Sequence, residues 1–185
     1  FLNNSASIGG AMYLLTGSYV SWSGPNTTFV SNTATSTLGG ATYVSGSKLS
    51  WKGATVMENN RAKLSGGAIC VISVAEVSWS GTTVFVKNSA QIGGAISVLR
   101  GSNPNPTTFY KCSFVGNTAV ATGGAIQSAA GEDFINETTF VGNTARVGGA
   151  LFLAGTTIFF NCSFVDNVAD EGAGPAISNI GYVQS

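Results

Sequence analysis

The sequence reads FVGNTA at residues 114–119 and GGAI at residues 123–126, and the organisation of the chain can be read from this pair of motifs. Versions of both recur along the whole chain, and the asparagine returns at intervals of 24 to 29 residues. The recurring asparagines are Asn4, Asn32, Asn60, Asn88, Asn117, Asn143 and Asn167. Self-similarity at a period of about 20 to 50 residues is typical of a solenoid or a propeller. The sequence therefore predicts a repeat architecture.

The residues after each glycine pair predict a short strand. Ile69 and Val71 occupy two positions that are apolar in most repeats. Alternate residues of a strand share one face, so we predict that both point inward. The position between them is Cys70 here and varies among tyrosine, serine, glutamine and phenylalanine in other repeats. It is predicted to face solvent, which would make Cys70 an exposed thiol.

Two further strands are predicted in each repeat. Leu49 and Trp51 alternate with polar residues in the second strand, and a glycine soon after the tryptophan marks a corner. In the third strand, an aromatic residue such as Phe114 lies three residues before the repeated asparagine. Cys112 and Cys162 lie two residues before such an aromatic residue, and both are expected to be small buried hydrophobes.

A repeat of 24 to 29 residues cannot bury a core alone, but stacked repeats can. Like residues would then lie above one another at the ~4.8 Å strand spacing. The predicted fold is all-β: a right-handed parallel β-helix, a solenoid of six to seven coils with three short strands per coil, over residues 1–185. A propeller is the competing fold, but its blades need about 40 residues or more and four strands. The asparagines are predicted to form a structural ladder at one corner, pairing above and below.

Charge and cysteine content exclude several classes of protein. Eight Lys and Arg balance eight Asp and Glu, so no basic surface for nucleic acid is expected. No apolar run reaches the length of about 18 residues that a membrane span needs. The three cysteines fit no zinc motif, and the chain has no histidine for acid–base chemistry. We expect no cofactor, no metal site and no catalytic residue.

Four N-x-S/T sequons in a chain with little charge indicate an extracellular or cell-surface protein that carries N-linked glycans. Asn161 is predicted to point outward because its neighbour Cys162 points inward, and Asn26 lies in a Gly-Pro corner. These two are the preferred glycosylation sites. The other two sequons begin at Asn3 and Asn136.

The pairing of Gly-Gly-Ala-Ile with Phe-x-x-Asn resembles the repeat of chlamydial polymorphic outer-membrane proteins. The first motif stands at residues 66–69, 93–96 and 123–126. The second begins at Phe1, Phe29, Phe85, Phe114, Phe140 and Phe164, and Met57 departs from it. Similar repeats occur in large surface proteins of algae and other protists. The resemblance implies a parallel β-helix that is displayed on a surface as a passenger or stalk, often adhesive and without catalysis.

The expected function is therefore that of a structural or adhesive module. The sequence begins inside one coil at Phe1 and stops inside another near Tyr182, without a visible cap. Uncapped solenoid ends expose edges that can pair. We expect either further coils on both sides, or copies that stack end to end into a filament.

A carbohydrate-active β-helix is the alternative, either an enzyme similar to polysaccharide lyases and epimerases or a glycan-binding module. Such enzymes need clustered carboxylates and a basic residue, for which Lys111 or Arg146 would serve. Two neighbouring corners could bring six acidic residues to one ledge: Glu132, Asp133, Glu137, Asp166, Asp170 and Glu171. The competing interpretation is that these are solvated charges at corners.

Overall fold

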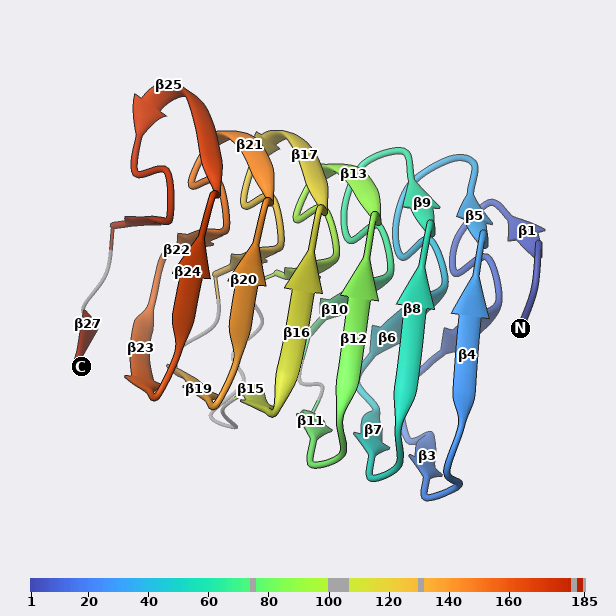
Figure 1. Ribbon diagram of the computed structural model, residues 1–185. Coiled ribbons are helices and arrows are strands. Elements are labelled where there is room, and N and C mark those ends of the chain that lie inside the picture. The colour runs from blue at the N-terminus through green and yellow to red at the C-terminus, as the bar shows by residue number, and fades with distance from the viewer. Residues whose placement is uncertain (74–75, 100–106, 130–131, 181–182, 185) are drawn as a thin grey trace.

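The fold is known from a computed structural model, which describes residues 1–73, 76–99, 107–129, 132–180 and 183–184. In these ranges all regular structure is β-strand, and every strand pairs in parallel with its equivalents in the next coils. Figure 1 shows the coils stacked side by side from the N-terminus to the C-terminus. The protein is a parallel β-solenoid of about six turns, which confirms the predicted architecture. The right-handed winding stays a prediction.

Each coil adds strands to four sheets in the described ranges. The first sheet, after the glycine pairs, contains β2 (Met12–Leu14), β6 (Thr42–Ser45), β10 (Ile69–Ile72), β14 (Ile96–Val98), β18 (Ile126–Ser128), β22 (Leu151–Leu153) and β26 (Ile177–Asn179). The second contains β3 (Tyr19–Trp22), β7 (Lys48–Trp51), β11 (Glu76–Trp79), β15 (Thr107–Tyr110), β19 (Glu132–Asn136), β23 (Thr156–Phe160) and β27 (Val183–Gln184). The third contains β4 (Thr27–Val30), β8 (Thr55–Glu58), β12 (Thr83–Val86), β16 (Cys112–Val115), β20 (Thr139–Val141) and β24 (Ser163–Val165). The fourth contains β1 (Ser5–Ala6), β5 (Thr33–Ala34), β9 (Arg61–Ala62), β13 (Ser89–Ile92), β17 (Thr118–Thr122), β21 (Thr144–Val147) and β25 (Val168–Ala173).

The fourth sheet corrects the prediction of three strands per coil. Its strands begin directly after the repeated asparagines, and β5 and β9 contain only two residues each. A two-residue strand is too short to show the alternation by which the other three strands were predicted, and register shifts interrupt the longer strands from β13 to β25. The sequence therefore assigned this segment to a corner, although its backbone pairs from coil to coil.

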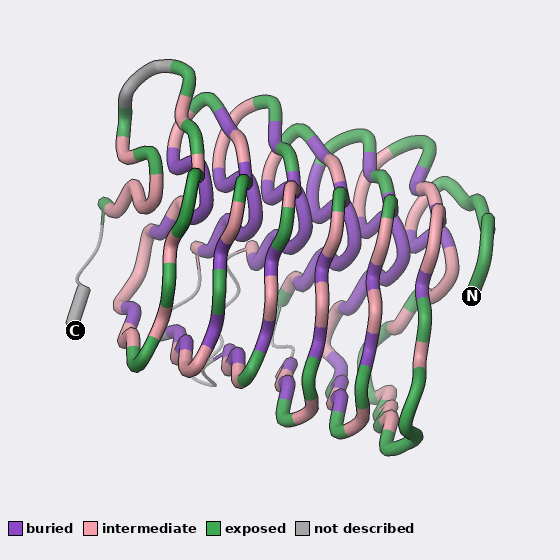
Figure 2. The backbone as a smooth tube through the Cα atoms, viewed as in Figure 1, coloured by how far each residue is buried: buried purple, intermediate pink, exposed green. Residues whose placement is uncertain are grey.

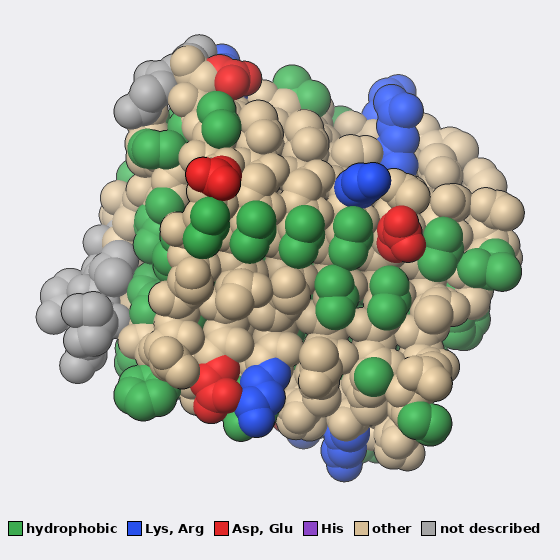
Figure 3. Space-filling model, viewed as in Figure 1, with side chains coloured by type: hydrophobic (Ala, Val, Ile, Leu, Met, Phe, Trp, Pro, Cys, Tyr) green, Lys and Arg blue, Asp and Glu red, His purple; other side chains and the backbone are tan. Residues whose placement is uncertain are grey.

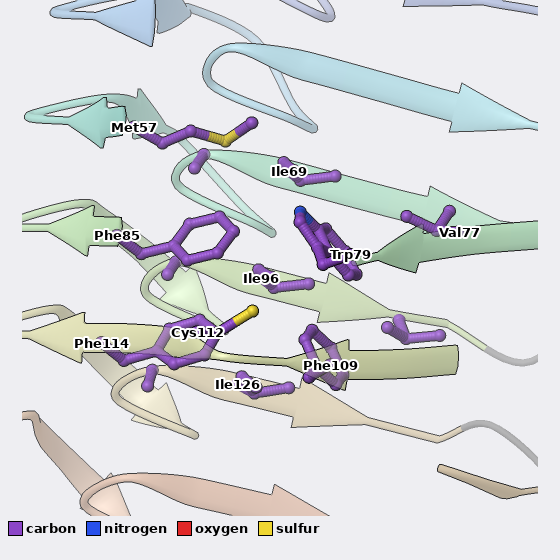
Figure 4. Close-up of a cluster of buried hydrophobic side chains, with 14 of the residues drawn as sticks. Met57, Ile69, Val77, Trp79, Phe85, Ile96, Phe109, Cys112, Phe114 and Ile126 are labelled. Atoms are coloured by element: carbon purple, nitrogen blue, oxygen red, sulfur yellow. The ribbon is translucent and has the colours of Figure 1, made fainter. Parts of the chain in front are cut away.

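The core is built from columns of like residues, because neighbouring strands pair in register. Phe85 lies opposite Phe114, and Trp51 opposite Trp79. The two phenylalanine rings stack with centroids 4.6 Å apart, and the two indoles with centroids 5.3 Å apart. Figure 4 shows these aromatic columns facing the isoleucine column that includes Ile96. Offset and edge-on aromatic pairs add about 0.5 to 1.5 kcal/mol each beyond their burial. The predicted inward positions are confirmed.

The middle position of the first sheet is buried from Tyr43 to Gln127, which corrects a second prediction, whereas Tyr13 in the first coil is 49% exposed. Cys70 has 0% exposure and Tyr43 has 7%. These two lie opposite each other in the column that also contains Tyr13, whose ring stacks on Tyr43 at 5.0 Å. Strand alternation within one coil cannot reveal this burial, because it takes no account of the neighbouring coils. Figure 2 shows that buried segments recur from coil to coil along the stack.

Burial also decides the state of the three cysteines, all of which are free thiols. It raises the pKa of Cys70 to about 12 and also raises that of Cys112. Both thiols are therefore protonated at neutral pH. Cys112 is buried as predicted, whereas Cys162 is only partly buried.

Candidate functional site

The repeated asparagines form one hydrogen-bonded column between the third and fourth sheets. At the centre, Nδ2 of Asn60 donates to Oδ1 of Asn88 at 3.0 Å and to the backbone oxygen of Phe29 at 2.9 Å. Oδ1 of Asn60 accepts from the backbone N–H and from Nδ2 of Asn32, at 3.0 and 2.9 Å. A side-chain link of this kind joins every neighbouring pair from Asn4 to Asn167.

The inner members of this ladder are fully buried and fully satisfied. Asn32, Asn60, Asn88, Asn117 and Asn143 have 0% exposure. An amide has two N–H donors and one oxygen that accepts twice, and Asn60 uses all four. The inner residues of the ladder therefore have no spare group with which to bind a ligand. Its chemistry is to join each coil to the next.

The second glycine of each pair allows the chain to pass very close to the fourth sheet. A Cβ on Gly67 would lie 2.6 Å from the backbone nitrogen and 2.7 Å from the backbone oxygen of Ser89, and would also meet the oxygen of Gly94. These are backbone atoms, which cannot move aside as a flexible side chain can. The glycine before it, Gly66, has φ of +65°. The repeated glycine pair is thus required by both conformation and space.

The four sequons lie at different depths. Asn3, Asn26 and Asn161 are exposed, whereas Asn136 is only partly exposed. Oδ1 of Asn136 is buried and has no hydrogen-bond partner. Three sequons are therefore accessible to a glycosyltransferase as folded, which keeps glycosylation a prediction at those positions.

The acidic residues considered for catalysis occupy different environments. Asp133 is 2% exposed and points into the core, whereas Glu137 lies at the surface and pairs with Lys111 at 3.7 Å. The side chains of Glu132 and Glu171 lie outside the described structure. Within the described residues, no three Cys, Asp or Glu side chains come together as a metal-binding group.

Asp133 is an acidic residue at an inward position of the second sheet. It lies opposite Thr107 and Thr157 in the second sheet, and hydrogen bonds from Ser128 and Thr107 lower its pKa. Burial opposes them and is the larger effect, so the pKa of Asp133 rises to about 6. Oδ1 of Asp133 and Oγ1 of Thr157 are buried without a partner. This group lies in the interior, away from any surface at which a polysaccharide could be cleaved.

The outer face of the third sheet carries a ridge of valines, visible as a row of hydrophobic side chains in Figure 3. Glu58 interrupts the row. Val115 and Val165 in this ridge are 36% and 45% exposed. The ridge consists of Val30, Val86, Val115, Val141 and Val165, which pair in register along the coils.

A groove of about 710 Å³ lies over the fourth sheet and includes residues of β5, β9, β13 and β17. Arg61 and Lys63 project from β9 and the residue after it, and both are exposed. Val120 stands at the β17 end with 72% exposure. There β17 has one residue more than β13, a β-bulge that pushes this side chain outward. Sequence analysis missed the groove, although each of its cations could have been located by counting from the repeated asparagine.

These features define a class of protein: a parallel β-solenoid whose coils are joined by a buried asparagine ladder. Residues 54–72 and 111–129 match the Chlamydia polymorphic membrane protein repeat, which confirms the resemblance found in the sequence. The two matches cover β8 to β10 and β16 to β18, and each includes a ladder asparagine and a glycine pair. No curated protein and no solved structure matches the chain. In the part of the chain that the structure describes, no helix is long and apolar enough to span a membrane.

Proposed function

We propose that this chain is a non-catalytic structural module of an extracellular or cell-surface protein, and that its side faces make adhesive contacts. The observation that carries the proposal is the ladder, because it ties every coil to the next through buried hydrogen bonds. The matching repeat is that of a membrane protein of Chlamydia, which supports the surface location.

A structural module built from a β-solenoid becomes longer by adding coils. At ~4.8 Å per coil, about six coils extend ~29 Å along the axis. Stacking of coils beyond this length is therefore part of the proposal, either within one chain or end to end between copies. A net charge of zero favours association, since it provides no overall repulsion between copies.

The adhesive part is supported by the valine ridge. Contiguous apolar surface on a soluble protein marks sites that contact other molecules. The ridge presents this surface on a flat sheet face, where the backbone is already paired between coils. N-linked glycans at the exposed sequons would leave this face accessible, because none of the four asparagines belongs to the ridge.

Asp133 and Glu137 do not support the enzymatic alternative, since Asp133 is buried and Glu137 is paired with Lys111, whereas Asp166 and Asp170 are exposed. The glycan-binding alternative depends on the groove over the fourth sheet.

Three measurements test the proposal. An antibody raised against the chain should label intact, unpermeabilised cells of the source organism, and staining only after permeabilisation would contradict a surface role.

Sedimentation over a concentration series should show end-to-end association, with longer particles in electron micrographs. A monomer at every concentration would remove the filament. Intact mass from a secreting eukaryotic host should fall on glycosidase treatment, and unchanged mass would remove the glycans.

A further inference from the structure

We infer that the groove over the fourth sheet binds a linear anionic polysaccharide, sulfated or uronate-containing, that lies along the coil axis. The inference rests on the proposed surface location and names the ligand of one side face. It starts from the direction of the groove. The lining residues come from β5, β9, β13 and β17, which are successive strands of one sheet, and from the residues directly after β5 and β9. A ligand in the groove therefore crosses the coils and extends along the stack, as a linear polymer would.

The charge of the groove selects an anion. Arg61 and Lys63 line it, and none of its described lining residues is acidic. The ion pairs found in the described ranges are Lys48 with Glu76 and Lys111 with Glu137, so the two groove cations are free of such pairs. A guanidinium group matches sulfate and carboxylate geometry with two parallel hydrogen bonds.

The remaining lining residues favour a sugar polymer over an acidic peptide. Thr33, Ser89, Gln91 and Thr118 offer hydroxyl and amide groups at the coil spacing, and Val120 adds an apolar wall. Sugar hydroxyls can pair with such groups, and their C–H faces can contact a valine. A peptide strand usually gains affinity by adding to a free sheet edge. The strands here already pair with their neighbours in the sheet, so this mode is closed along the groove.

The neighbouring coils show which substitutions the groove tolerates. Arg61 lies in register with Thr33 and Ser89, and Lys63 follows one residue after the pairing of Ala34 with Ala62, at the level of Thr35. The double variant Arg61→Ser and Lys63→Thr therefore installs residue types that other coils already use. A matched control is Lys52→Ser with Lys87→Ser, because both lysines are exposed and lie outside the groove.

The test measures binding of the whole chain to heparin fragments, polygalacturonate, neutral dextran and polyglutamate, at low and at physiological salt. Circular dichroism of each variant checks that the coils remain folded. We expect binding to at least one of the two anionic polysaccharides, weakening as salt rises, and none to dextran. The groove variant should lose about tenfold in affinity, and the control variant less than about twofold.

Four outcomes would overturn the inference: no binding to either anionic polysaccharide, binding to dextran as tight as to them, an equal loss in both variants, or tighter binding to polyglutamate. The last would assign the groove to acidic peptides, and the third would reduce the effect to overall charge. None of the four affects cell-surface labelling or sedimentation, so a failure here is distinct from failure of the proposed function.

Discussion

The ladder can be tested by changing one atom in each of two adjacent residues. Asn60 is completely buried in the ladder, whereas Asn59 is exposed beside it. Asn→Asp replaces an NH₂ group with an oxygen and leaves shape almost unchanged. In the parent, Nδ2 of Asn60 donates to the backbone oxygen of Phe29 at 2.9 Å and to Oδ1 of Asn88 at 3.0 Å. In the variant, the new oxygen at position 60 faces these two acceptors and cannot donate to either. At position 59 it faces water.

The expected cost at position 60 follows from these contacts. Leaving two buried groups without their hydrogen bonds costs about 1 to 3 kcal/mol each, hence about 2 to 6 kcal/mol in the free energy of unfolding. Burial of a carboxylate adds to this at neutral pH. Asn59→Asp should stay within about 0.5 kcal/mol of the parent, because surface changes rarely exceed that. Asn59 has φ of +52°, a conformation that aspartate also tolerates.

The loss at position 60 should depend on pH in one direction. Burial and the two facing oxygens raise the pKa of the introduced carboxyl above its unfolded value of about 3.9. Stability from such a group is present below the unfolded pKa and is lost as pH rises through the folded pKa. Asn60→Asp should therefore recover part of its stability in acid, where the protonated carboxyl can donate one hydrogen bond.

Urea unfolding of the parent and both variants, followed by tryptophan fluorescence at pH 7 and pH 4, measures these differences. The indoles of Trp51 and Trp79 are buried in the same coils and report on their opening. If Asn60→Asp cost no more than Asn59→Asp at pH 7, the ladder would not hold the coils together. If its cost did not fall at pH 4, the buried-charge argument would be wrong.

Two further predictions concern the glycine pairs and the buried carboxylate. Gly67→Ala should lower the free energy of unfolding by about 3 kcal/mol or prevent folding, because the new Cβ meets backbone atoms. Gly24→Ala has nothing within 4 Å of its Cβ, so in the same urea assay it should be neutral or stabilising by up to about 1 kcal/mol. Equal effects of the two substitutions would contradict the close-packing argument. The pKa of Asp133 is raised from 3.8 to about 6, so its contribution to stability is complete below pH 3.8 and is lost as pH rises through 6. In urea titrations, Asp133→Asn should therefore have a higher free energy of unfolding than the parent at pH 7, by about 3 kcal/mol at most, and this advantage should be gone near pH 4. A constant difference across this range would show that Asp133 does not titrate in the fold.

The fold could be predicted from the sequence because the residues that a solenoid requires recur in every coil. A single Phe-x-x-Asn is weak evidence, but a column of such motifs fixes both the period and the register. Phe85 and Phe114 had to stack once Asn88 and Asn117 were aligned, and the structure places them 4.6 Å apart. The same reasoning identified the inward positions of the first and third strands, where alternation within one strand is enough.

What the sequence could not show depends on contacts between coils or on very short segments. Cys70 is fully buried at the middle position of its strand, between Tyr43 and Ser97 of the neighbouring coils, and the surroundings that stacked coils create do not enter an alternation pattern. The fourth sheet was missed because β1, β5 and β9 have two residues each and register shifts interrupt the longer strands from β13 to β25. That sheet is also the one that carries the groove, so the error in strand number concealed the proposed binding surface as well.

The division of labour within one coil explains how such a module can gain contacts without losing its fold. The ladder and the second glycines are constrained by backbone atoms on both sides, so almost any substitution there leaves a buried group unpaired or a Cβ without space. The outward residues of the fourth sheet face no such limit, since threonine, arginine and serine occupy one register position in three successive coils. Binding specificity in this architecture is therefore expected to lie in outward columns such as that of Arg61, while the repeated motifs that reveal the fold carry no information about the ligand.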